Sequence, residues 1–495
     1  MKKSIIFIAT TLFLLFFGAG TAFSQNEFED WSKQMNAEFD AFKAQIEQEF
    51  RDFREQANAE FAAFLGKSWE GFSASPDIPA PKPLEPEKPV VVAPEQKPAA
   101  DPMPFDKVTP MPAPKPRPQP VAPILPPTPE TPTPEPTKPG YAFQFYNTEC
   151  KVSLDNSHRF SLPDATEQSV TQAWKTLSGQ QYDALIYDCL VLRDQLNLCD
   201  WGYLQLLKTM SENFFSKTSN EAVLLQMFIL TQSGYKVRIA RADSRLALLV
   251  PFQQTVYGHV YLNIDGVKYY VINKELKGQS FHICNQEFPK EQYFSWQTNQ
   301  PKLAKKLTAP KTFSSTLYQE IHAPIQTNQN LMDFYNNYPL TSEWNVYVRA
   351  GMSATVKQTL YPELQNAIAG KTKTEAANIL LTFLQFAFDY QTDDKQFGYE
   401  RPFFADENFF YPYNNCKDRA IMYCILVKEL LGLEVVLLHY PNHLATAVCF
   451  PEDVTGDYLT VDGKKFVVCD PTYIGARIGM AMDDCKQAKA QVVRL

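Results

Sequence analysis

Three short segments in the last third of the chain carry the residue types of a thiol-dependent acyl-transfer site. Cys416 opens an apolar run typical of a helix, His443 begins a strand-like stretch, and Asp470 closes another strand before Pro471. A thiolate is the nucleophile in such chemistry, an imidazole holds and donates the proton, and a carboxylate orients the imidazole. The ordered set therefore predicts a Cys-His-Asp catalytic site.

The elements expected around these residues explain how they would meet. The dipole and free amides at a helix start favour negative charge, which suits Cys416 as a thiolate. Small side chains at Ala445 and Ala447 share one strand face with His443 and leave room for that helix. The backbone N–H of Cys416 is one oxyanion donor. A second would come from the aromatic approach to Cys416, where the candidates are Tyr399, Tyr411, Tyr413 and Asn414.

Each catalytic candidate has a structural alternative when it is taken alone. A cysteine at a helix start is usually structural, a strand histidine is often a core residue, and an aspartate before proline often forms a turn. His439 is a rival base that we interpret as structural. The nine cysteines show no metal-ligand spacing, so we expect neither a metal nor a cofactor. Their odd number leaves at least one unpaired within the monomer.

The motifs around the three residues are similar to those of the transglutaminase-like superfamily, which has a papain-like fold with the order Cys, His, Asp. The similar segments are Cys416 to Ala420, His443 to Val448 and Asp470 to Thr472. Residues 140–495, including Gln396 to Phe404, resemble exported transglutaminase-domain proteins of Bacteroides-like bacteria. The resemblance implies an α+β fold and a thioester on Cys416. Its members include proteases, amidases, cross-linkers and non-catalytic scaffolds, so it leaves the substrate open.

One position departs from the family's pattern. An acidic residue commonly follows the family's cysteine, whereas here Lys417 follows Cys416. We expect a nearby lysine to favour the thiolate. The change could also alter substrate preference.

The globular part is predicted to contain two tandem transglutaminase-like α+β units, at 140–300 and 301–495. Both contain an apolar helix ending at a glycine, a strand, and a later Asp-Gly pair typical of a hairpin turn. Aligning them sets three unreactive residues opposite the catalytic candidates: Thr218 opposite Cys416, Arg245 opposite His443 and Asn273 opposite Asp470. The first unit would then be a degenerate pseudoenzyme domain. Chance resemblance between two helix-then-hairpin segments is the alternative.

The N-terminus predicts export. Lys2 and Lys3 precede the apolar run Ile5 to Phe17, and a small-residue cleavage site follows, so residues 1–24 are predicted to be a signal peptide. An N-terminal membrane anchor is the alternative, but the run is shorter than the ~20 residues that span a bilayer. No later segment is long and apolar enough, so we expect no transmembrane segment after cleavage. The protein would be periplasmic, cell-surface or secreted.

Residues 26–73 carry an 11-residue repeat of Glu-Phe pairs, at Glu27, Glu38, Glu49 and Glu60. This period predicts a long helix with a right-handed drift of its aromatic stripe. A lone helix cannot bury such a stripe, which favours self-association as a coiled-coil-like oligomer. Membrane-surface binding is the alternative, but anionic lipid should repel an acidic segment.

Residues 75–139 hold 24 of the 37 prolines. Such a run predicts an extended, semi-rigid spacer, with a ligand for a proline-binding domain as the alternative. The net charge of the whole chain is −8 and it contains no basic block, which argues against nucleic acid as a partner.

These observations predict an exported enzyme that acts on amide or peptide bonds through a Cys416 thioester. Release by water would make it a peptidase or amidase, and release by an amine would make it a transglutaminase. Proteins, peptides or peptidoglycan stem peptides are the substrates that the compartment suggests. The alternative is a non-catalytic cell-envelope binding or scaffolding protein built on the same domains.

Overall fold

The computed structural model describes residues 25–79, 86–92, 101–111, 140–252, 255–273, 276, 280–295, 300–315, 317–318 and 320–495. The predicted signal peptide at 1–24 lies outside the described residues. Helices make up 40% and strands 23%, so the expected α+β class is confirmed. The chain divides into two compact units, Met1–Glu60 and Phe61–Leu495.

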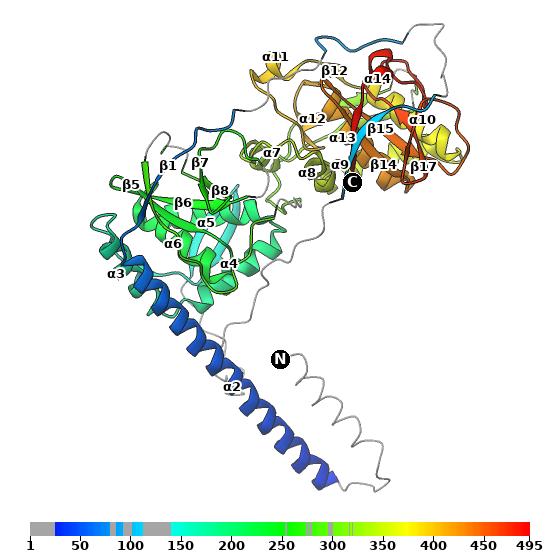
Figure 1. Cartoon of the computed structure of the whole chain (residues 1–495). Coiled ribbons are helices and arrows are strands. Elements are labelled where there is room, and N and C mark those ends of the chain that lie inside the picture. The colour runs from blue at the N-terminus through cyan, green and yellow to red at the C-terminus, as the bar shows by residue number, and fades with distance from the viewer. Residues whose placement is uncertain are drawn as a thin grey trace. The chain divides into compact units, whose positions relative to one another are not determined.

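The described part of the N-terminal unit belongs to the predicted long helix, α2 (Gln25–Leu65) (Figure 1). The helix was predicted to extend to residue 73, but it ends at Leu65, and Glu70–Ser73 form a strand. Side-chain hydrogen bonds between glutamine and glutamate recur every 11 residues: Gln34 to Glu38 at 3.0 Å, Gln45 to Glu49 at 2.9 Å and Gln56 to Glu60 at 2.8 Å. Large apolar side chains in the same repeat are exposed: Phe39, Phe42, Ile46, Phe50 and Phe53. Self-association through this stripe stays a prediction.

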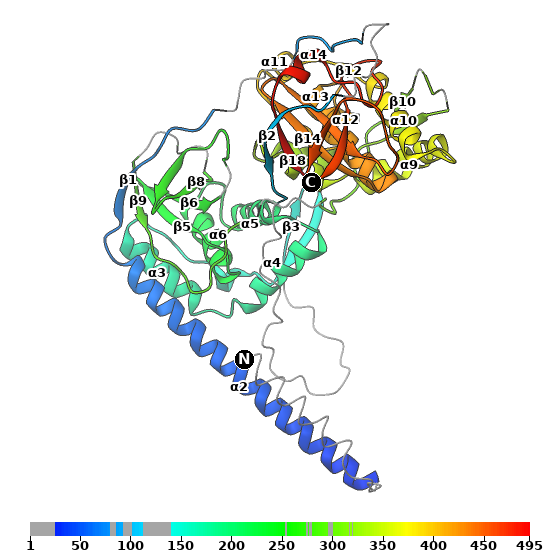
Figure 2. The same ribbon diagram turned by 45° about the vertical axis from the view of Figure 1, so that its right-hand side comes forward.

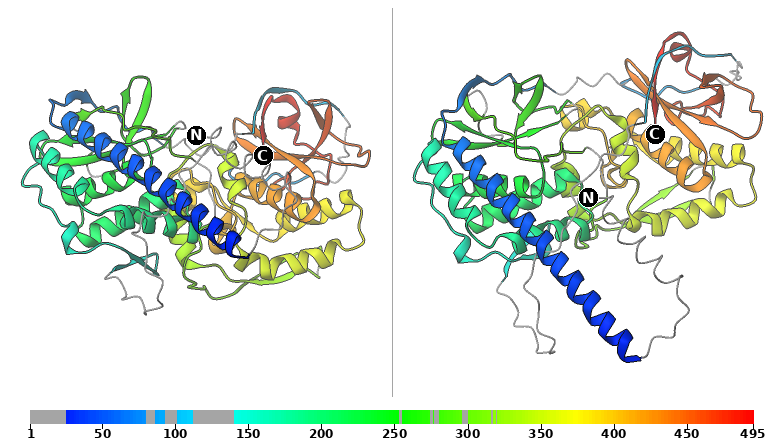
Figure 3. Two further views of the ribbon diagram at one scale, coloured as in Figure 1. Left: turned by 90° about the horizontal axis from the view of Figure 1, so that it is seen from below. Right: turned by 60° about the horizontal axis from the view of Figure 1, so that its bottom comes forward.

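The first half of the second unit packs helices against a six-stranded sheet (Figure 3). Its helices are η1 (Asn156–His158), α3 (Glu167–Ser178), α4 (Asp183–Gln195), α5 (Asp200–Phe214) and α6 (Asn220–Gln232). The sheet contains β1 (Glu70–Ser73), β5 (Arg238–Ala242), β6 (Arg245–Pro251), β7 (Tyr261–Ile264), β8 (Val267–Val271) and β9 (Ser280–Cys284). A separate hairpin joins β3 (Tyr141–Phe145) to β4 (Thr148–Val152).

The second half holds another six-stranded sheet and the helix that begins at Cys416. The helices are α7 (Gln329–Asn336), α8 (Trp344–Ala350), α9 (Ala354–Ile368), α10 (Lys373–Phe386), α11 (Asp393–Phe397), α12 (Glu407–Phe410), α13 (Cys416–Leu426), the π-helical η3 (Val427–Leu431) and α14 (Asp483–Gln487). The sheet contains β2 (Phe105–Thr109), β14 (Glu434–Tyr440), β15 (His443–Cys449), β16 (Tyr458–Val461), β17 (Lys464–Cys469) and β18 (Ala490–Arg494). Two small pairings complete it, β10 (Lys311–Ser314) with β11 (His322–Ile325) and β12 (Asp389–Tyr390) with β13 (Tyr413–Asn414).

The two sheets share one strand order. The first runs β7-β8-β6-β5-β9-β1 and the second runs β16-β17-β15-β14-β18-β2. In the first half, α6 packs on the sheet and β9 pairs with β5. In the second half, α13 packs on the sheet and β18 pairs with β14 in the same way. The predicted Asp-Gly hairpin turns are confirmed, because Asp265, Gly266, Asp462 and Gly463 all have positive φ, at 51°, 79°, 51° and 76°.

The described parts of the proline-rich segment are built into the second unit, which differs from the predicted extended, semi-rigid spacer. The carbonyl of Ile78 accepts a hydrogen bond from the amide of Gly258 at 2.9 Å, and Val92 donates one to the carbonyl of Ile474 at 3.0 Å. Strand β2 extends the second sheet in parallel to β18 (Figure 2). The physical reason lies in the apolar residues between the prolines, which bury surface in the core, while the prolines suit edge positions.

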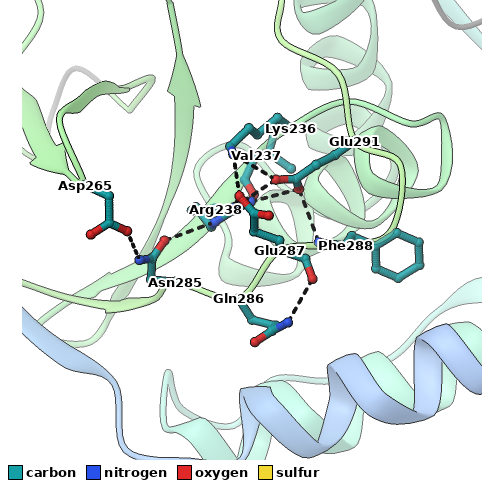
Figure 4. A network of polar contacts seen from close by, with 9 residues as sticks. All are labelled: Lys236, Val237, Arg238, Asp265, Asn285, Gln286, Glu287, Phe288 and Glu291. Atoms are coloured by element: carbon teal, nitrogen blue, oxygen red, sulfur yellow. Dashed lines mark hydrogen bonds and ion pairs between the residues drawn. The ribbon is translucent and has the colours of Figure 1, made fainter.

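A polar network in the first half pairs its charges internally (Figure 4). The guanidinium of buried Arg238 donates to both carboxylate oxygens of Glu291, at 3.0 and 2.9 Å. Lys236 donates to Glu287 at 2.6 Å. These pairs fasten β5 to the segment that follows β9. This concentration of charge therefore stabilises the junction between β5, an inner strand of the sheet, and that segment.

If the proline-rich segment is part of the core, its buried methionine should matter for stability. Met103 is 6% exposed and packs in the second sheet's core, whereas Met111 is 57% exposed. We expect Met103→Ala to lower the free energy of unfolding by about 2–4 kcal/mol, since burial and packing are both lost. Urea unfolding of both variants measures this. Met111→Ala is the matched control and should have almost no effect, and equal effects of the two substitutions would contradict the assignment.

Candidate active site

The predicted positions of the three catalytic candidates within their elements are observed. Cys416 is the first residue of α13, His443 is the first residue of β15, and Asp470 follows the last residue of β17. Asn415 caps the helix, because its side chain accepts from the amide of Lys417 at 3.2 Å. Asp418 accepts in return from the amide of Asn415 at 3.0 Å, which completes a capping box.

His443 and Asp470 form a buried pair. The Nε2 atom of His443 lies 2.7 Å from Oδ2 of Asp470, and the other carboxylate oxygen accepts from the amides of Thr472 and Tyr473 at 2.9 and 3.2 Å. Burial by itself lowers the pKa of His443, but the charge and hydrogen bond of Asp470, together with the Cys416 side chain, outweigh it and raise this pKa to about 10. The pair therefore favours an imidazolium at neutral pH.

The second ring nitrogen of His443 is left for the thiol. Helix α13 packs against β15, and the Cys416 side chain helps to raise the pKa of His443. Nδ1 has no partner within ordinary hydrogen-bond geometry among the described residues. The Cys416 side chain thus contributes to the raised pKa of the imidazole, although its sulfur and Nδ1 do not meet ordinary hydrogen-bond geometry. Cys416 is only 2% exposed, so a reaction requires the site to open.

The charged run after Cys416 is buried and paired. Lys417 contacts carboxylate oxygens of Asp393 at 3.0 Å and Glu400 at 2.9 Å. Burial and the neighbouring Asp393 raise the pKa of Asp418 well above its ordinary value. Because two carboxylates share the charge of Lys417, the expectation that this lysine favours a Cys416 thiolate loses its physical basis. The run instead anchors the start of α13.

None of the four predicted oxyanion donors forms a hydrogen bond with Cys416 or His443 among the described contacts. Asn414 donates to Asn408 at 3.0 Å and accepts from Arg419 at 2.8 Å, so its side chain is structural. The hydroxyl of Tyr411 donates to Asn336 at 2.9 Å. Tyr399 and Tyr413 are exposed. The backbone N–H of Cys416 stays a predicted oxyanion donor at the helix start.

Gln385 is a positioning residue that the sequence analysis missed. It is buried on α10, and its Nε2 atom lies 3.2 Å from the carbonyl of Asp470, 2.8 Å from that of Tyr473 and 3.0 Å from that of Ala476. Its Oε1 atom accepts from the amide of Gly475 at 3.2 Å. One side chain thus holds the whole loop that carries the carboxylate. A glutamine between Leu384 and Phe386 was the signal that could have found it.

His439 has the structural role that was expected of it. It lies on β14, its ring meets Trp344 edge-on at 5.4 Å, and burial lowers its pKa even though Gln491 hydrogen-bonds to it. Because burial disfavours its charged form, His439 is a poor partner for a thiolate.

The structure shows which residues of the first half correspond to Cys416, His443 and Asp470. Two of the three predicted counterparts keep their positions, and the counterpart of Cys416 does not. Ala447 pairs with Val468 in the second sheet and Leu249 pairs with Val271 in the first. These two pairings set the register between the halves. Four residues before Ala447 and Leu249 lie His443 and Arg245, so these two residues correspond. Two residues after Val468 and Val271 lie Asp470 and Asn273, which correspond in the same way, as predicted.

The predicted counterpart of Cys416, Thr218, lies before the helix begins. Ser219 caps α6, so Asn220 takes the first helical position that Cys416 takes in α13. From the capping residue to the glycine at the end, the second helix spans 415–432 and the first spans 219–234, a difference of two residues. The π-helical turn at Val427–Leu431 takes up these two residues. An alignment on the glycines therefore placed Thr218, and not Asn220, opposite Cys416. Asn220 and Asn273 accept hydrogen bonds from the amides of Leu246 and Leu248, at 2.9 and 3.0 Å. Both side chains therefore stabilise backbone.

Comparison of the chain with models of protein families, with curated proteins and with solved structures found no match. The resemblance to the transglutaminase-like superfamily therefore stays a prediction. Within the described ranges, no group of three or more metal-binding side chains was found. Of the helices that the structure describes, none is long and apolar enough to cross a membrane.

Removing the Gln385 side-chain amide should loosen the Asp470 loop. Gln385→Leu leaves buried backbone groups without partners, and we expect a loss of about 2–4 kcal/mol in the free energy of unfolding. It should also slow alkylation of Cys416, measured by peptide mapping of the folded protein. Gln226→Leu is the matched control, because Gln226 is buried in the first half and donates to the carbonyl of Leu204 at 3.0 Å. Equal alkylation rates in both variants would contradict the positioning role.

The raised pKa of His443 predicts a specific pH dependence of stability. A base whose pKa rises from 6.5 to about 10 on folding contributes stability that is complete below pH 6.5 and disappears as the pH approaches 10. The gap in unfolding free energy between the wild type and Asp470→Asn should therefore be widest near pH 6 and narrow toward pH 10. Urea unfolding across this range measures it, with His322→Gln as the control, because His322 is an exposed histidine on β11 and its removal leaves the His443–Asp470 pair intact. A constant gap would rule out an imidazolium in the pair.

Proposed function

We propose that this protein is an exported thiol-dependent acyl-transfer enzyme that cleaves amide or peptide bonds through a Cys416 thioester. The observation that carries the proposal is the buried His443–Asp470 pair, 2.7 Å apart, beside the helix that starts at Cys416. A carboxylate that holds an imidazole next to a thiol at a helix start is the arrangement that nucleophilic catalysis by cysteine requires.

The reaction would proceed in two steps. The sulfur of Cys416 attacks the carbonyl carbon, a carbon–sulfur bond forms, and the N–H of Cys416 stabilises the oxyanion. His443 then gives its proton to the departing amine as the carbon–nitrogen bond breaks, which leaves a thioester. In the second step His443 takes a proton from water, whose oxygen displaces the sulfur and releases a carboxylic acid. An amine in place of water would give a new amide and hence a cross-link.

We further propose that the chain contains two tandem transglutaminase-like units, of which the first is degenerate. The shared strand order and the equivalent hairpin positions support a duplication. Arg245 and Asn273, together with Asn220 at the helix start, offer no nucleophile and no base in the first unit. Acyl transfer would then belong to the second unit alone.

The compartment and the partners follow from the N-terminal segments. The signal-like sequence at 1–24 favours export, and exported acyl-transfer enzymes meet proteins, peptides and peptidoglycan stem peptides. The exposed aromatic stripe of α2 supports self-association.

A non-catalytic scaffold is the second candidate, and one observation favours it. Cys416 is almost fully buried, so the site is closed to substrates in this conformation. A binding protein that kept the fold without turnover would also tolerate a closed site.

Alkylation kinetics distinguish the enzyme from the scaffold. Iodoacetamide should modify Cys416 faster than the half-buried Cys449. Peptide mapping of samples taken over time measures the two rates. His443→Ala should slow modification of Cys416 by roughly tenfold or more, because the imidazolium no longer stabilises the thiolate. His439→Ala is the matched control and should leave the rate unchanged. If Cys449 reacts first and His443→Ala has no effect, the scaffold is the better account.

A further inference from the structure

A pocket of about 240 Å³ lies in the second unit, where three distant parts of the chain meet. Tyr257, Gly258 and His259 come from the first half. The segment from α7 to α8 contributes Tyr335, Asn336, Tyr338, Pro339, Leu340 and Tyr347. The segment before α12 contributes Tyr399, Arg401, Pro402 and Phe404. Most of the lining is aromatic. The pocket is smaller than the ~300–1,000 Å³ of sites for drug-sized ligands, so it suits a group the size of one amino-acid residue.

Two buried donors of the pocket lining have no partner among the described residues. Arg401 is 5% exposed, and its Nη2 atom donates to Glu407 at 2.5 Å and to Asn336 at 2.6 Å, but its Nη1 atom is unpaired. The hydroxyl of Tyr335, a residue that is 3% exposed, is also unpaired. Buried polar groups are nearly always hydrogen-bonded, so two such donors in one pocket point to an acceptor-bearing ligand.

Aromatic contacts hold both donors in place. The ring of Tyr335 stacks on Phe404 with 4.1 Å between centroids. The guanidinium of Arg401 lies over the rings of Phe397 and Tyr411, at 5.0 and 4.8 Å. Arg401 is the one residue with a permanent charge among the described residues that line the pocket, and this charge is already paired with Glu407. Its unused Nη1 atom and the hydroxyl of Tyr335 are therefore what the pocket offers to an acceptor group. A guanidinium with one edge unused matches the planar geometry of a carboxylate.

The pocket is tied to the start of the Cys416 helix by two hydrogen bonds. The amide of Arg401 donates to Asp393 at 2.6 Å, and the other oxygen of Asp393 accepts from the side chain of Asn415 at 2.7 Å. Asn415 is the residue that caps α13. A ligand held by Arg401 would therefore sit on the same rigid frame as the nucleophile.

We propose that this pocket binds the free carboxylate of a single amino-acid residue with an apolar or aromatic side chain, as at the C-terminus of a peptide. Arg401 and Tyr335 bind the carboxylate, and the tyrosine rings pack against the body. The first half then contributes a wall of the site through Tyr257 to His259, which gives the unreactive half a role. The link between this pocket and catalysis rests on the proposed function, whereas the binding itself does not.

Calorimetric titration of the full chain tests the chemistry of the ligand. N-acetyl-L-phenylalanine should bind, and N-acetyl-L-phenylalaninamide, which lacks only the charged carboxylate, should bind about tenfold more weakly or not at all. Glucuronate presents a carboxylate on a sugar and should also bind more weakly than N-acetyl-L-phenylalanine. Equal binding of the acid and the amide would overturn the proposal. Tighter binding of glucuronate than of N-acetyl-L-phenylalanine would show that the ligand carboxylate does not come from a peptide.

A matched pair of variants tests the site. Removing Arg401 would leave the charge of Glu407 buried and could unfold the protein, so Tyr335→Phe is the better choice, because it removes only an unpaired hydroxyl. It should leave the Tm unchanged and weaken binding of N-acetyl-L-phenylalanine about tenfold. Tyr347→Phe makes the same change in the same pocket, but that hydroxyl already donates to the carbonyl of Thr341 at 3.2 Å. It should lower the Tm and leave binding unchanged.

The result separates this proposal from the proposed function. Cys416→Ala should bind N-acetyl-L-phenylalanine as tightly as the wild type, because Cys416 does not line the pocket. Binding that is retained in Cys416→Ala and lost in Tyr335→Phe supports the pocket whether or not Cys416 is catalytic. Binding that is unaffected by Tyr335→Phe overturns the pocket and leaves the catalytic proposal standing.

Discussion

The contact on which the site depends is the buried ion pair between His443 and Asp470. Burying an imidazolium and a carboxylate is costly unless hydrogen bonds complete their remaining donor and acceptor positions. Here the amides of Thr472 and Tyr473 bind the second oxygen of Asp470, and Gln385 holds the backbone of the same loop. The pair therefore fixes one ring nitrogen of His443 and leaves the other to face the start of α13. Without this support, neither the protonation nor the orientation of His443 would be defined.

A second set of buried charges holds the start of α13. Lys417 pairs with the carboxylates of Asp393 and Glu400, and Asp418 accepts hydrogen bonds from the amides of Asn415 and Phe403. The resulting frame fixes where α13 begins and therefore where Cys416 lies. The first half places its buried charges elsewhere, around Arg238 on the inner strand β5 and Glu291 in the segment after β9. The two halves thus share a strand order but use charge differently, which fits a reactive site in only one of them.

Local signals in the sequence predicted much of this arrangement. The helix start at Cys416, the strand that begins at His443 and the two Asp-Gly turns each depend on a few neighbouring residues, and each is found where expected. What the sequence did not reveal depends on distant contacts. Gln385 binds a loop some 90 residues away, and a π-helical turn in the Cys416 helix displaced the predicted counterpart to Thr218. The proline-rich segment was predicted as a spacer because proline signals local extension, while its pairing with β18 depends on residues almost 400 positions away.

The most direct measurement of the central claim is the trapping of an acyl group on Cys416. The folded protein is incubated with p-nitrophenyl acetate, quenched in acid, and mapped by mass spectrometry before and after neutral hydroxylamine, which removes thioesters. The account predicts an acetyl group on Cys416 that hydroxylamine removes, that forms faster than on any other cysteine, and that forms more slowly in His443→Ala. Acetylation confined to exposed lysines, or a rate at Cys416 that is independent of His443, would contradict it.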